Sequence, residues 1–269
     1  MTEQLHSPDR TNRELIPYCF KVFKFHNYLV ANAILFTMEE GEGLKVAQIS
    51  ERIEASLGES VPTSTIAHTL PDLAWLDLIR RTGSKRSSAH SLSPLAIASK
   101  EAFLSMINHL ADPIKSETLE RARVDYDSQV PEELEQAIEQ FEPSATKQVP
   151  ALRRVLTALS NETRLRILIT LGEKVGEPTS YRGIFSALDE QGKKVPASTL
   201  SNQLTRLEQA NLITRGSDNF SLSELGLEAI NAYLIYQEQT RKPALTSHAG
   251  ILERDLGLDQ GSLRIPSLT

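Results

Sequence analysis

The sequence has little of what disulfide-bonded, metal-binding and membrane proteins require. It contains one cysteine, Cys19, which excludes an internal disulfide and any zinc site built from two or more thiolates. No stretch approaches the ~18 to 20 consecutive apolar residues of a membrane span, so we expect neither a transmembrane helix nor a membrane partner. The polar start also lacks the apolar segment of a secretory signal. We therefore expect a cytoplasmic protein without a cleaved leader.

Patterns that carry catalysis or bind cofactors are missing as well. The sequence has no glycine-rich phosphate loop, no G-x-S-x-G turn and no C-x-x-C pair, and its 13 glycines are spread along the chain. No two histidines have the helical spacing of metal ligands. The six histidines are His6, His26, His68, His90, His109 and His248. The sequence therefore predicts no enzymatic activity, no metal site and no cofactor.

Positive charge is not in excess. The 29 Lys and Arg residues stand against 35 Asp and Glu, which gives a net charge of −6. No global field draws the whole molecule onto nucleic acid, so any basic patch must be local. The negative charge gathers in residues 112–150, where ten acidic side chains accompany four basic ones.

We interpret residues 112–150 as an acidic helical linker. Four prolines interrupt any continuous helix there: Pro113, Pro131, Pro143 and Pro150. Pro131 suits the first turn of a short helix that runs to about Phe141. A solubilising spacer is the favoured role, because charged runs are usually solvated. The alternative is an acidic strip that competes with phosphate for a basic hairpin.

An internal repeat is the strongest signal in the chain. Val61–Arg81 matches Val195–Arg215 without a gap, 134 positions later, with nine of 21 residues identical. Ser91–Ile97 also resembles Ser221–Leu227. Such self-similarity indicates a duplicated folding unit. We divide the chain into an N-terminal domain, the linker, a C-terminal domain and a tail that is weakly structured apart from a short helix near Ile251–Leu256. Their bounds are 1–111, 112–150, 151–240 and 241–269.

The C-terminal copy begins with two helices. Apolar spacing predicts one helix over 152–159 and a second that Asn161 caps and Gly172 ends. The second helix turns its leucines and isoleucines inward, and we expect Arg164 and Arg166 to stay outside. A third helix over Tyr181–Leu188 is expected to bury Ile184, Phe185 and Leu188.

A fourth helix, Ser198–Ala210, combines an apolar face with a polar one. Leu200, Leu204 and Leu207 lie at spacings of four and three, so they share one side. The opposite face carries Ser198, Ser201, Asn202, Thr205, Arg206 and Gln209. A hairpin over 212–222 follows, and a last helix from Glu224 to about Gln239 turns Leu227, Ile230, Tyr233 and Leu234 inward.

This order of helices and hairpin is that of the winged helix-turn-helix, in which the helix before the hairpin reads base edges in a major groove. The sequence thus predicts a mostly helical protein with small β-hairpin wings, made of two tandem winged helix-turn-helix domains joined by an acidic helical linker.

Leu159–Leu171 followed by Ser198–Arg215 resembles the ArsR-type winged-helix repressors. The resemblance covers about 90 residues and implies sequence-specific binding to double-stranded DNA as a dimer or dimer-like pair. The cysteine motif of the metal-sensing members is absent, so their metal chemistry does not carry over. The candidate DNA-contacting residues of this copy are Ser198, Thr199, Ser201, Asn202, Thr205, Arg206 and Arg215.

The N-terminal copy departs from this pattern. A core helix over Asn27–Met38 is expected to bury Leu29, Val30, Ala33 and Ile34, and helices over 46–57 and 64–75 follow. Pro71 lies inside the last helix and is expected to kink it, and Asp72 on the same helix would repel phosphate. The candidate DNA-contacting residues of this helix are Ser64, Thr65 and His68.

The N-terminal hairpin is longer and cationic. It carries Arg80, Arg81, Lys85, Arg86 and His90 with no acid between them. Phosphate or minor-groove contact suits such a hairpin, and we favour this over a merely solvated loop.

Aromatic residues gather in Tyr18–Val30. Core packing or contact with a second copy or another protein is favoured for this segment, with a cofactor pocket as the alternative. We expect the single tryptophan, Trp75, to be buried against the other domain.

The function favoured by the sequence is a nucleoid-associated transcriptional regulator that binds double-stranded DNA. The alternative is a protein-interaction adaptor, which would use the same fold without a reading face. The net negative charge and the proline in the N-terminal reading helix favour the adaptor, whereas the polar face of Ser198–Gln209 and the cationic hairpin favour DNA.

Overall fold

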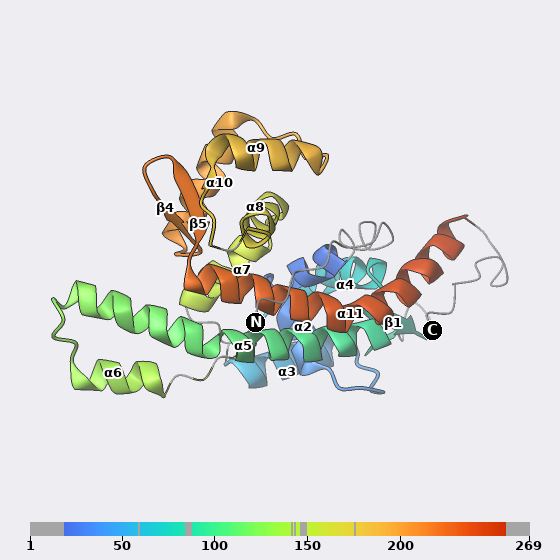
Figure 1. Cartoon of the computed structure of the whole chain (residues 1–269). Coiled ribbons are helices and arrows are strands. Elements are labelled where there is room, and N and C mark those ends of the chain that lie inside the picture. The colour runs from blue at the N-terminus through green and yellow to red at the C-terminus, as the bar shows by residue number, and fades with distance from the viewer. Residues whose placement is uncertain are drawn as a thin grey trace. The chain divides into compact units, whose positions relative to one another are not determined.

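A computed structural model of the 269-residue chain shows a mostly helical protein in which short strands form small antiparallel sheets (Figure 1). It describes residues 19–58, 60–83, 88–140, 142, 144–145, 150–174 and 176–256, and the side chains of these as far as residue 247. No helix in this part of the chain combines the length and apolar character needed to cross a membrane.

The chain folds as two compact units. Of the described residues, the N-terminal unit comprises 19–102 and 237–256, and the C-terminal unit comprises 103–236. Two long helices therefore have residues in both units: α5 (Pro94–Asp125) and α11 (Glu224–Leu256). Residues 103–111, which the sequence analysis assigned to the first domain, group with the C-terminal unit. Helix α5 also continues without a break past residue 112, where the linker was expected to begin.

Two prolines expected to mark interruptions lie inside these helices. Pro113 is within α5 and Pro243 is within α11. The residue that follows each proline is buried: Ile114 after Pro113 and Ala244 after Pro243. Burial of these neighbours offsets the loss of one backbone donor. Residues 241–250, expected to be weakly structured, are consequently helical. The short helix expected near Ile251–Leu256 is the end of α11, and residues 257–269 lie outside the described part.

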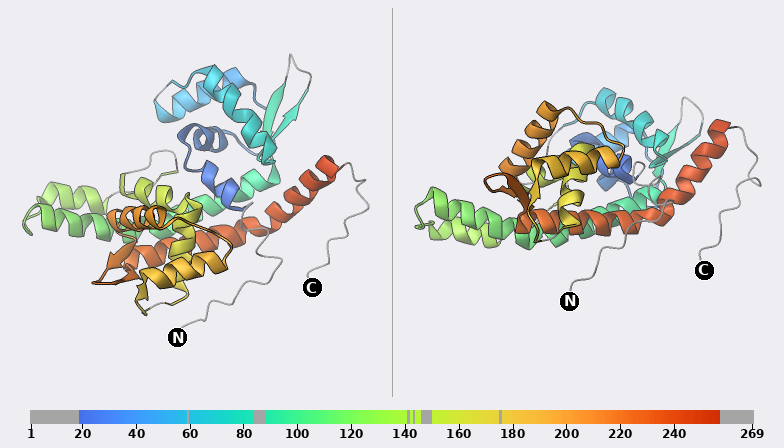
Figure 2. Two further views of the ribbon diagram at one scale, coloured as in Figure 1. Left: turned by 90° about the horizontal axis from the view of Figure 1, so that it is seen from above. Right: turned by 45° about the horizontal axis from the view of Figure 1, so that its top comes forward.

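The N-terminal unit consists of helices followed by a two-stranded hairpin and the beginning of α5 (Figure 2). After a helical segment at 19–25, its elements are α2 (Leu29–Thr37), α3 (Val46–Leu57), α4 (Thr63–Trp75), β1 (Ile79–Thr82) and β2 (Ala89–Leu92). The strands are antiparallel and pair Ile79 with Leu92 and Arg81 with His90. Leu44 forms a bridge to His90 from the other edge.

The core of this unit lies between its helices. Ile34, Ile49, Ile53, Ile66 and Leu73 are completely buried. The sequence placed Leu29 in this core, but α2 begins at that residue and Leu29 is half exposed at the helix end.

The last part of α11 belongs to the same core. Thr240 and Ala244 are fully buried, and the thiol of Cys19 forms a hydrogen bond with Thr240. Burial raises the pKa of Cys19 to about 11, so this thiol stays protonated and unreactive at neutral pH.

A buried histidine crosslinks the N-terminal unit. His26 Nδ1 lies 2.9 Å from Asn32 Oδ1, and its Nε2 lies 2.7 Å from Ser99 Oγ. Because the Asn32 oxygen can only accept, Nδ1 carries the proton and Nε2 accepts from the serine hydroxyl. Burial lowers the pKa of His26 to about 4, despite both hydrogen bonds.

This pKa predicts an acid-sensitive fold. In the unfolded chain His26 binds a proton near pH 6.5, whereas in the folded chain it stays neutral to about pH 4. The stability from neutral His26 is therefore fully present above pH 6.5 and is lost as the pH falls toward 4. Between pH 7 and 4.5, wild type should lose about 2 kcal/mol more unfolding free energy than His26→Gln, measured by urea titration. Equal pH dependence of the two proteins would contradict this.

The C-terminal unit repeats the same order of elements (Figure 1). Its elements are the last part of α5, α6 (Glu132–Glu139), α7 (Pro150–Leu159), α8 (Glu162–Gly172), β3 (Thr179–Ser180), α9 (Tyr181–Glu190), α10 (Ala197–Gln209), β4 (Ile213–Arg215), β5 (Asn219–Leu222) and the first part of α11. The sheet order is β3-β5-β4, with β3 the one strand here that the sequence did not predict. Helix α6 confirms the short helix expected after Pro131.

The duplicated segments fold alike residue by residue. Helices α4 and α10 each have 13 residues and follow a proline at the N-cap. Their buried ridges occupy matching positions: Ile66, Leu70 and Leu73 in α4, and Leu200, Leu204 and Leu207 in α10. Each helix is followed by a residue in the left-handed conformation, Asp77 with φ 51° and Asn211 with φ 54°. Asp and Asn tolerate this conformation better than most residues.

One glycine allows α11 to approach the start of the C-terminal hairpin. A Cβ atom on Gly226 would overlap the carbonyl oxygen of Leu212. Because Gly226 has no side chain, its amide can donate to Ser223 Oγ at 2.9 Å. The Ser223 amide donates in turn to Leu212 O at 3.2 Å.

Gly226→Ala should therefore destabilise the C-terminal unit by about 1 to 3 kcal/mol, because the backbone must move to accept one methyl group. Gly216→Ala is the matched control, since a Cβ there would meet its nearest neighbour, Asn219 O, at an ordinary 3.7 Å. Thermal unfolding of both variants checks this. Equal melting temperatures would show that the close approach at Gly226 is not required.

Candidate nucleic-acid interface

Helix α10 presents a polar face because its apolar face is buried. Leu200, Leu204 and Leu207 have exposed fractions of 0, 2 and 0%, so the rotation of the helix is fixed. The opposite residues expected from the sequence are all exposed, and so is the further candidate Thr199. These opposite residues are Ser198, Ser201, Asn202, Thr205, Arg206 and Gln209. The predicted division of this helix into two faces is confirmed.

Two residues of this face are joined by a side-chain contact. Arg206 Nε donates to Asn202 Oδ1 at 3.3 Å, one helical turn away. No salt bridge within the described part of the chain involves Arg206. This contact uses the side-chain oxygen of Asn202 and the Nε–H of Arg206. The NH2 group of Asn202 and the two terminal nitrogens of Arg206 remain as hydrogen-bond donors for a partner.

Arg164 was expected on the outside of α8, and this prediction is wrong. The residue is 6% exposed, and its guanidinium donates to Thr157 O at 2.7 Å and Ala158 O at 3.3 Å. It also donates to Gln203 Oε1 on α10 at 3.0 Å. The arginine therefore satisfies carbonyls at the C-terminal end of α7 and links them to α10. Burial, and then the charge of Arg206, lower the pKa of Arg164.

Other cations near α10 are neutralised by a carboxylate. Glu162 receives Lys193 Nζ at 2.9 Å and Arg166 at 3.1 Å. The hydrogen bond from Lys193 is the main cause that lowers the pKa of Glu162, against its partial burial. Phe185 of α9, expected to be inward, is 40% exposed, because Ile184 and Leu188 alone fill that part of the core.

The C-terminal hairpin is held at its base by α5. The Asn211 side chain donates to Glu117, which also pairs with Arg121 at 2.5 Å. Arg121 in turn reaches the carbonyl of Gln209, the last residue of α10, at 3.5 Å. At the other end of the hairpin Arg215 is exposed, with its guanidinium 5.7 Å from the ring centre of Phe220. The carboxylate of Glu117 therefore binds Asn211 and Arg121 instead of pointing freely into solvent.

In the N-terminal unit, α4 exposes the three expected residues, Ser64, Thr65 and His68. Asp72 is exposed on the same helix, as the sequence indicated. Pro71 lies within α4, and the helix continues without a break to Trp75.

The N-terminal hairpin is less cationic than expected. Arg80 and Arg81 are exposed, but Arg80 lies 3.6 Å from the Asp77 carboxylate. His90 is buried in β2, where burial and then the charge of Arg81 lower its pKa. His90 is therefore not a cation of the hairpin, because its strand position turns it toward the core. Lys85 and Arg86 lie outside the described residues.

Within the N-terminal unit the Trp75 side chain is 62% exposed, with Lys21 Nζ 5.3 Å from the ring centre. Burial of Trp75 against the other domain stays a prediction. The aromatic segment that begins at Tyr18 is divided: Phe23 and His26 are in the core, whereas Tyr28 is half exposed. Tyr18 itself lies outside the described residues.

Among the described side chains no group of three His, Cys, Asp or Glu residues could hold a metal ion. Comparison of the chain with protein-family models, curated proteins and solved structures gives no match.

Sequence reasoning missed the hydrogen bond between Arg164 and Gln203, which joins α8 to α10. The burial of Arg164 could have been predicted from helical spacing. Arg164, Leu168 and Leu171 lie four and three residues apart, so they share the inward face of α8. The acceptors that make such burial favourable come from α7 and α10, and the spacing within α8 does not reveal them.

Arg164→Ala should destabilise the C-terminal unit by about 2 kcal/mol, because it leaves buried carbonyls and Gln203 without a donor. Arg164→Lys should rescue little, since one ammonium does not span three acceptors. Arg166→Ala, which breaks a partly exposed ion pair, should cost less than about 1 kcal/mol. Urea unfolding of the three variants checks this order. Equal losses for Arg164→Ala and Arg166→Ala would contradict the bracing role.

Proposed function

We propose that this chain is a transcriptional regulator that binds double-stranded DNA, and that its two units are tandem winged helix-turn-helix domains. The observation that carries the proposal is the exposed polar face of α10, set by the buried ridge of Leu200, Leu204 and Leu207. Asn and Arg are the residue types that pair with two atoms of an adenine or a guanine edge. Asn202 and Arg206 therefore carry the base discrimination.

Phosphate contacts come from the ends of the same elements. The N-cap of α10 is Pro196, whose side chain cannot accept from the free amides of the first turn. Those amides, with the hydroxyls of Ser198 and Thr199, suit a phosphate oxygen. Arg215 on the C-terminal hairpin and Arg81 on the N-terminal hairpin are exposed and add charge without reading sequence.

The two units would act as a covalent counterpart of a repressor dimer. Two reading helices that enter successive major grooves on one DNA face are separated by about 34 Å, which implies an operator of ~20 or more base pairs. A second chain is not needed for this arrangement. The proposal includes no catalytic step and no metal or cofactor.

A second candidate function is a protein-interaction adaptor. The observation that favours it is in α4, where Asp72 is exposed on the face that corresponds to the reading face of α10. A carboxylate there repels phosphate. In this reading the N-terminal unit binds a protein partner, and the net charge of −6 opposes general attachment to DNA.

Arg206→Ala tests the proposed reading face. On the specific site the variant should lose about 1 to 3 kcal/mol of binding free energy, with little change on random DNA, because a base contact is removed. Arg81→Ala should weaken binding equally on both and reduce the salt dependence. The measurement is a gel-shift titration at two salt concentrations, with the specific site first selected from genomic fragments.

Arg153→Ala is the matched control, because Arg153 is an exposed arginine of α7 in the same unit. It should bind as the wild type does. Equal losses for Arg206→Ala on specific and random DNA would contradict the reading role. No salt-dependent shift for the wild-type protein, together with a protein partner recovered by affinity purification, would favour the adaptor.

A further inference from the structure

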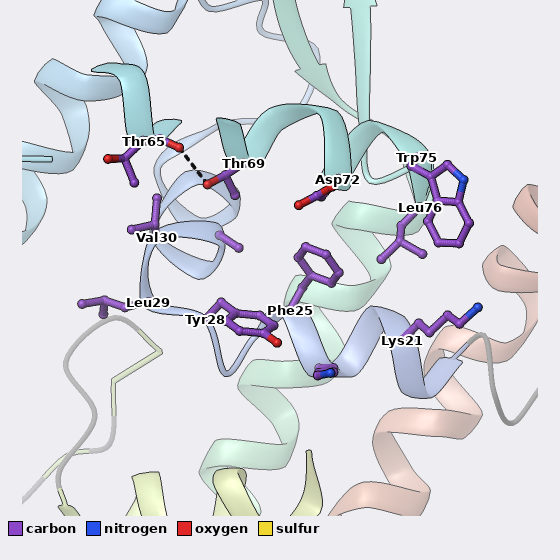
Figure 3. A pocket seen from close by; sticks show the side chains of 12 residues that line it. Lys21, Phe25, Tyr28, Leu29, Val30, Thr65, Thr69, Asp72, Trp75 and Leu76 are labelled. Carbon is purple, nitrogen blue, oxygen red and sulfur yellow. Dashed lines mark hydrogen bonds between the residues drawn. The ribbon is translucent and has the colours of Figure 1, made fainter. Parts of the chain in front are cut away.

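An open groove in the N-terminal unit brings large apolar side chains together with lysines. Its volume is about 600 Å³, and it lies between the segment 21–31 and helix α4 (Figure 3). The residues that matter for its chemistry are Lys21, Lys24, Phe25, Tyr28, Asp72 and Trp75.

Aromatic rings give the groove an apolar lining at the protein surface. Phe25 and Tyr28 meet edge to face, with ring centres 5.8 Å apart. Tyr28 and Trp75 are 50% and 62% exposed, and Leu29 beside them is 54% exposed. Exposed apolar residues that line one concave surface mark a binding site more often than scattered ones do. The volume is that of sites for small organic molecules.

The charged residues of the lining determine whether an anionic, neutral or cationic ligand suits the groove. Lys21 and Lys24 line the wall formed by the helical segment 19–25, and no salt bridge of the described residues involves either. Asp72 is the one acidic residue of the lining, on the α4 wall (Figure 3). The lining therefore has a net positive charge, with its cations beside the aromatic rings.

We propose that this groove binds a small aromatic carboxylate. The ring of the ligand would pack against the aromatic lining beside Phe25, which lies between Tyr28 and Trp75 (Figure 3). Its carboxylate would accept hydrogen bonds from Lys21 and Lys24. A neutral aromatic molecule would fill the same space without the charged contacts, and an aromatic amine would be repelled by the lysines. The proposal concerns binding alone and does not depend on the proposed DNA contact.

The only tryptophan of the sequence lines the groove, so its fluorescence reports occupancy directly. The probe is 3-phenylpropionate, and the uncharged 3-phenylpropanol is its matched control. Without DNA, titration of the full chain should change Trp75 emission, and isothermal calorimetry should give a dissociation constant for the carboxylate at least about tenfold below that of the alcohol.

The double variant Lys21→Gln, Lys24→Gln should reduce this ratio to about one. Lys174→Gln, at an exposed lysine of the other unit, should leave it unchanged. Asp72→Asn should tighten carboxylate binding severalfold, because it removes a repulsive charge. Circular dichroism confirms that each variant is folded.

The proposal would be overturned if the carboxylate did not bind, or if the wild-type protein bound the carboxylate and the alcohol equally. Calorimetric binding that leaves Trp75 emission unchanged would overturn it as well. A ratio that survives the double lysine variant would also overturn it, because the charge preference would then come from another place.

Discussion

The burial of three apolar side chains on one side of α10 determines what this helix can offer to any partner. Fully burying each leucine contributes about 1.5 to 3 kcal/mol relative to leaving it exposed. Turning the helix by one residue would expose part of this ridge, so Asn202 and Arg206 are held outward by the core behind them. Arg164 adds a polar brace, since its guanidinium links two carbonyls of α7 to Gln203 in the same helix.

The two copies share this construction but differ in what they expose. Helix α4 has a buried ridge at the matching positions, yet its outer side carries Asp72 where α10 carries Arg206. The N-terminal unit also has the aromatic groove beside α4, and the equivalent of Trp75 in the other copy is Gln209. The two helices therefore offer chemically different exposed faces on a shared construction.

Local pattern predicted the parts of the fold that depend on neighbours in sequence. Leucine spacing found the two faces of α10, and Asn161 caps α8 by accepting from the Arg164 amide as expected. The internal repeat located α4, α10 and both hairpins, because identical spacing gives identical local structure.

The pattern failed where burial depends on distant partners. Arg164 and His90 are polar, and their burial follows from acceptors or strand pairs elsewhere in the fold. Pro113 and Pro243 lie inside long helices because packing around them is stronger than their local effect.

The central claim is that α10 reads bases through its exposed side, and selection of binding sequences from a random pool of DNA duplexes tests it most directly. Wild-type protein should enrich one defined motif, and Asn202→Ala should lose the preference at one base position while it keeps the rest of the motif. Failure of the wild-type protein to enrich any sequence, or recovery of the unaltered motif by the variant, would contradict the account.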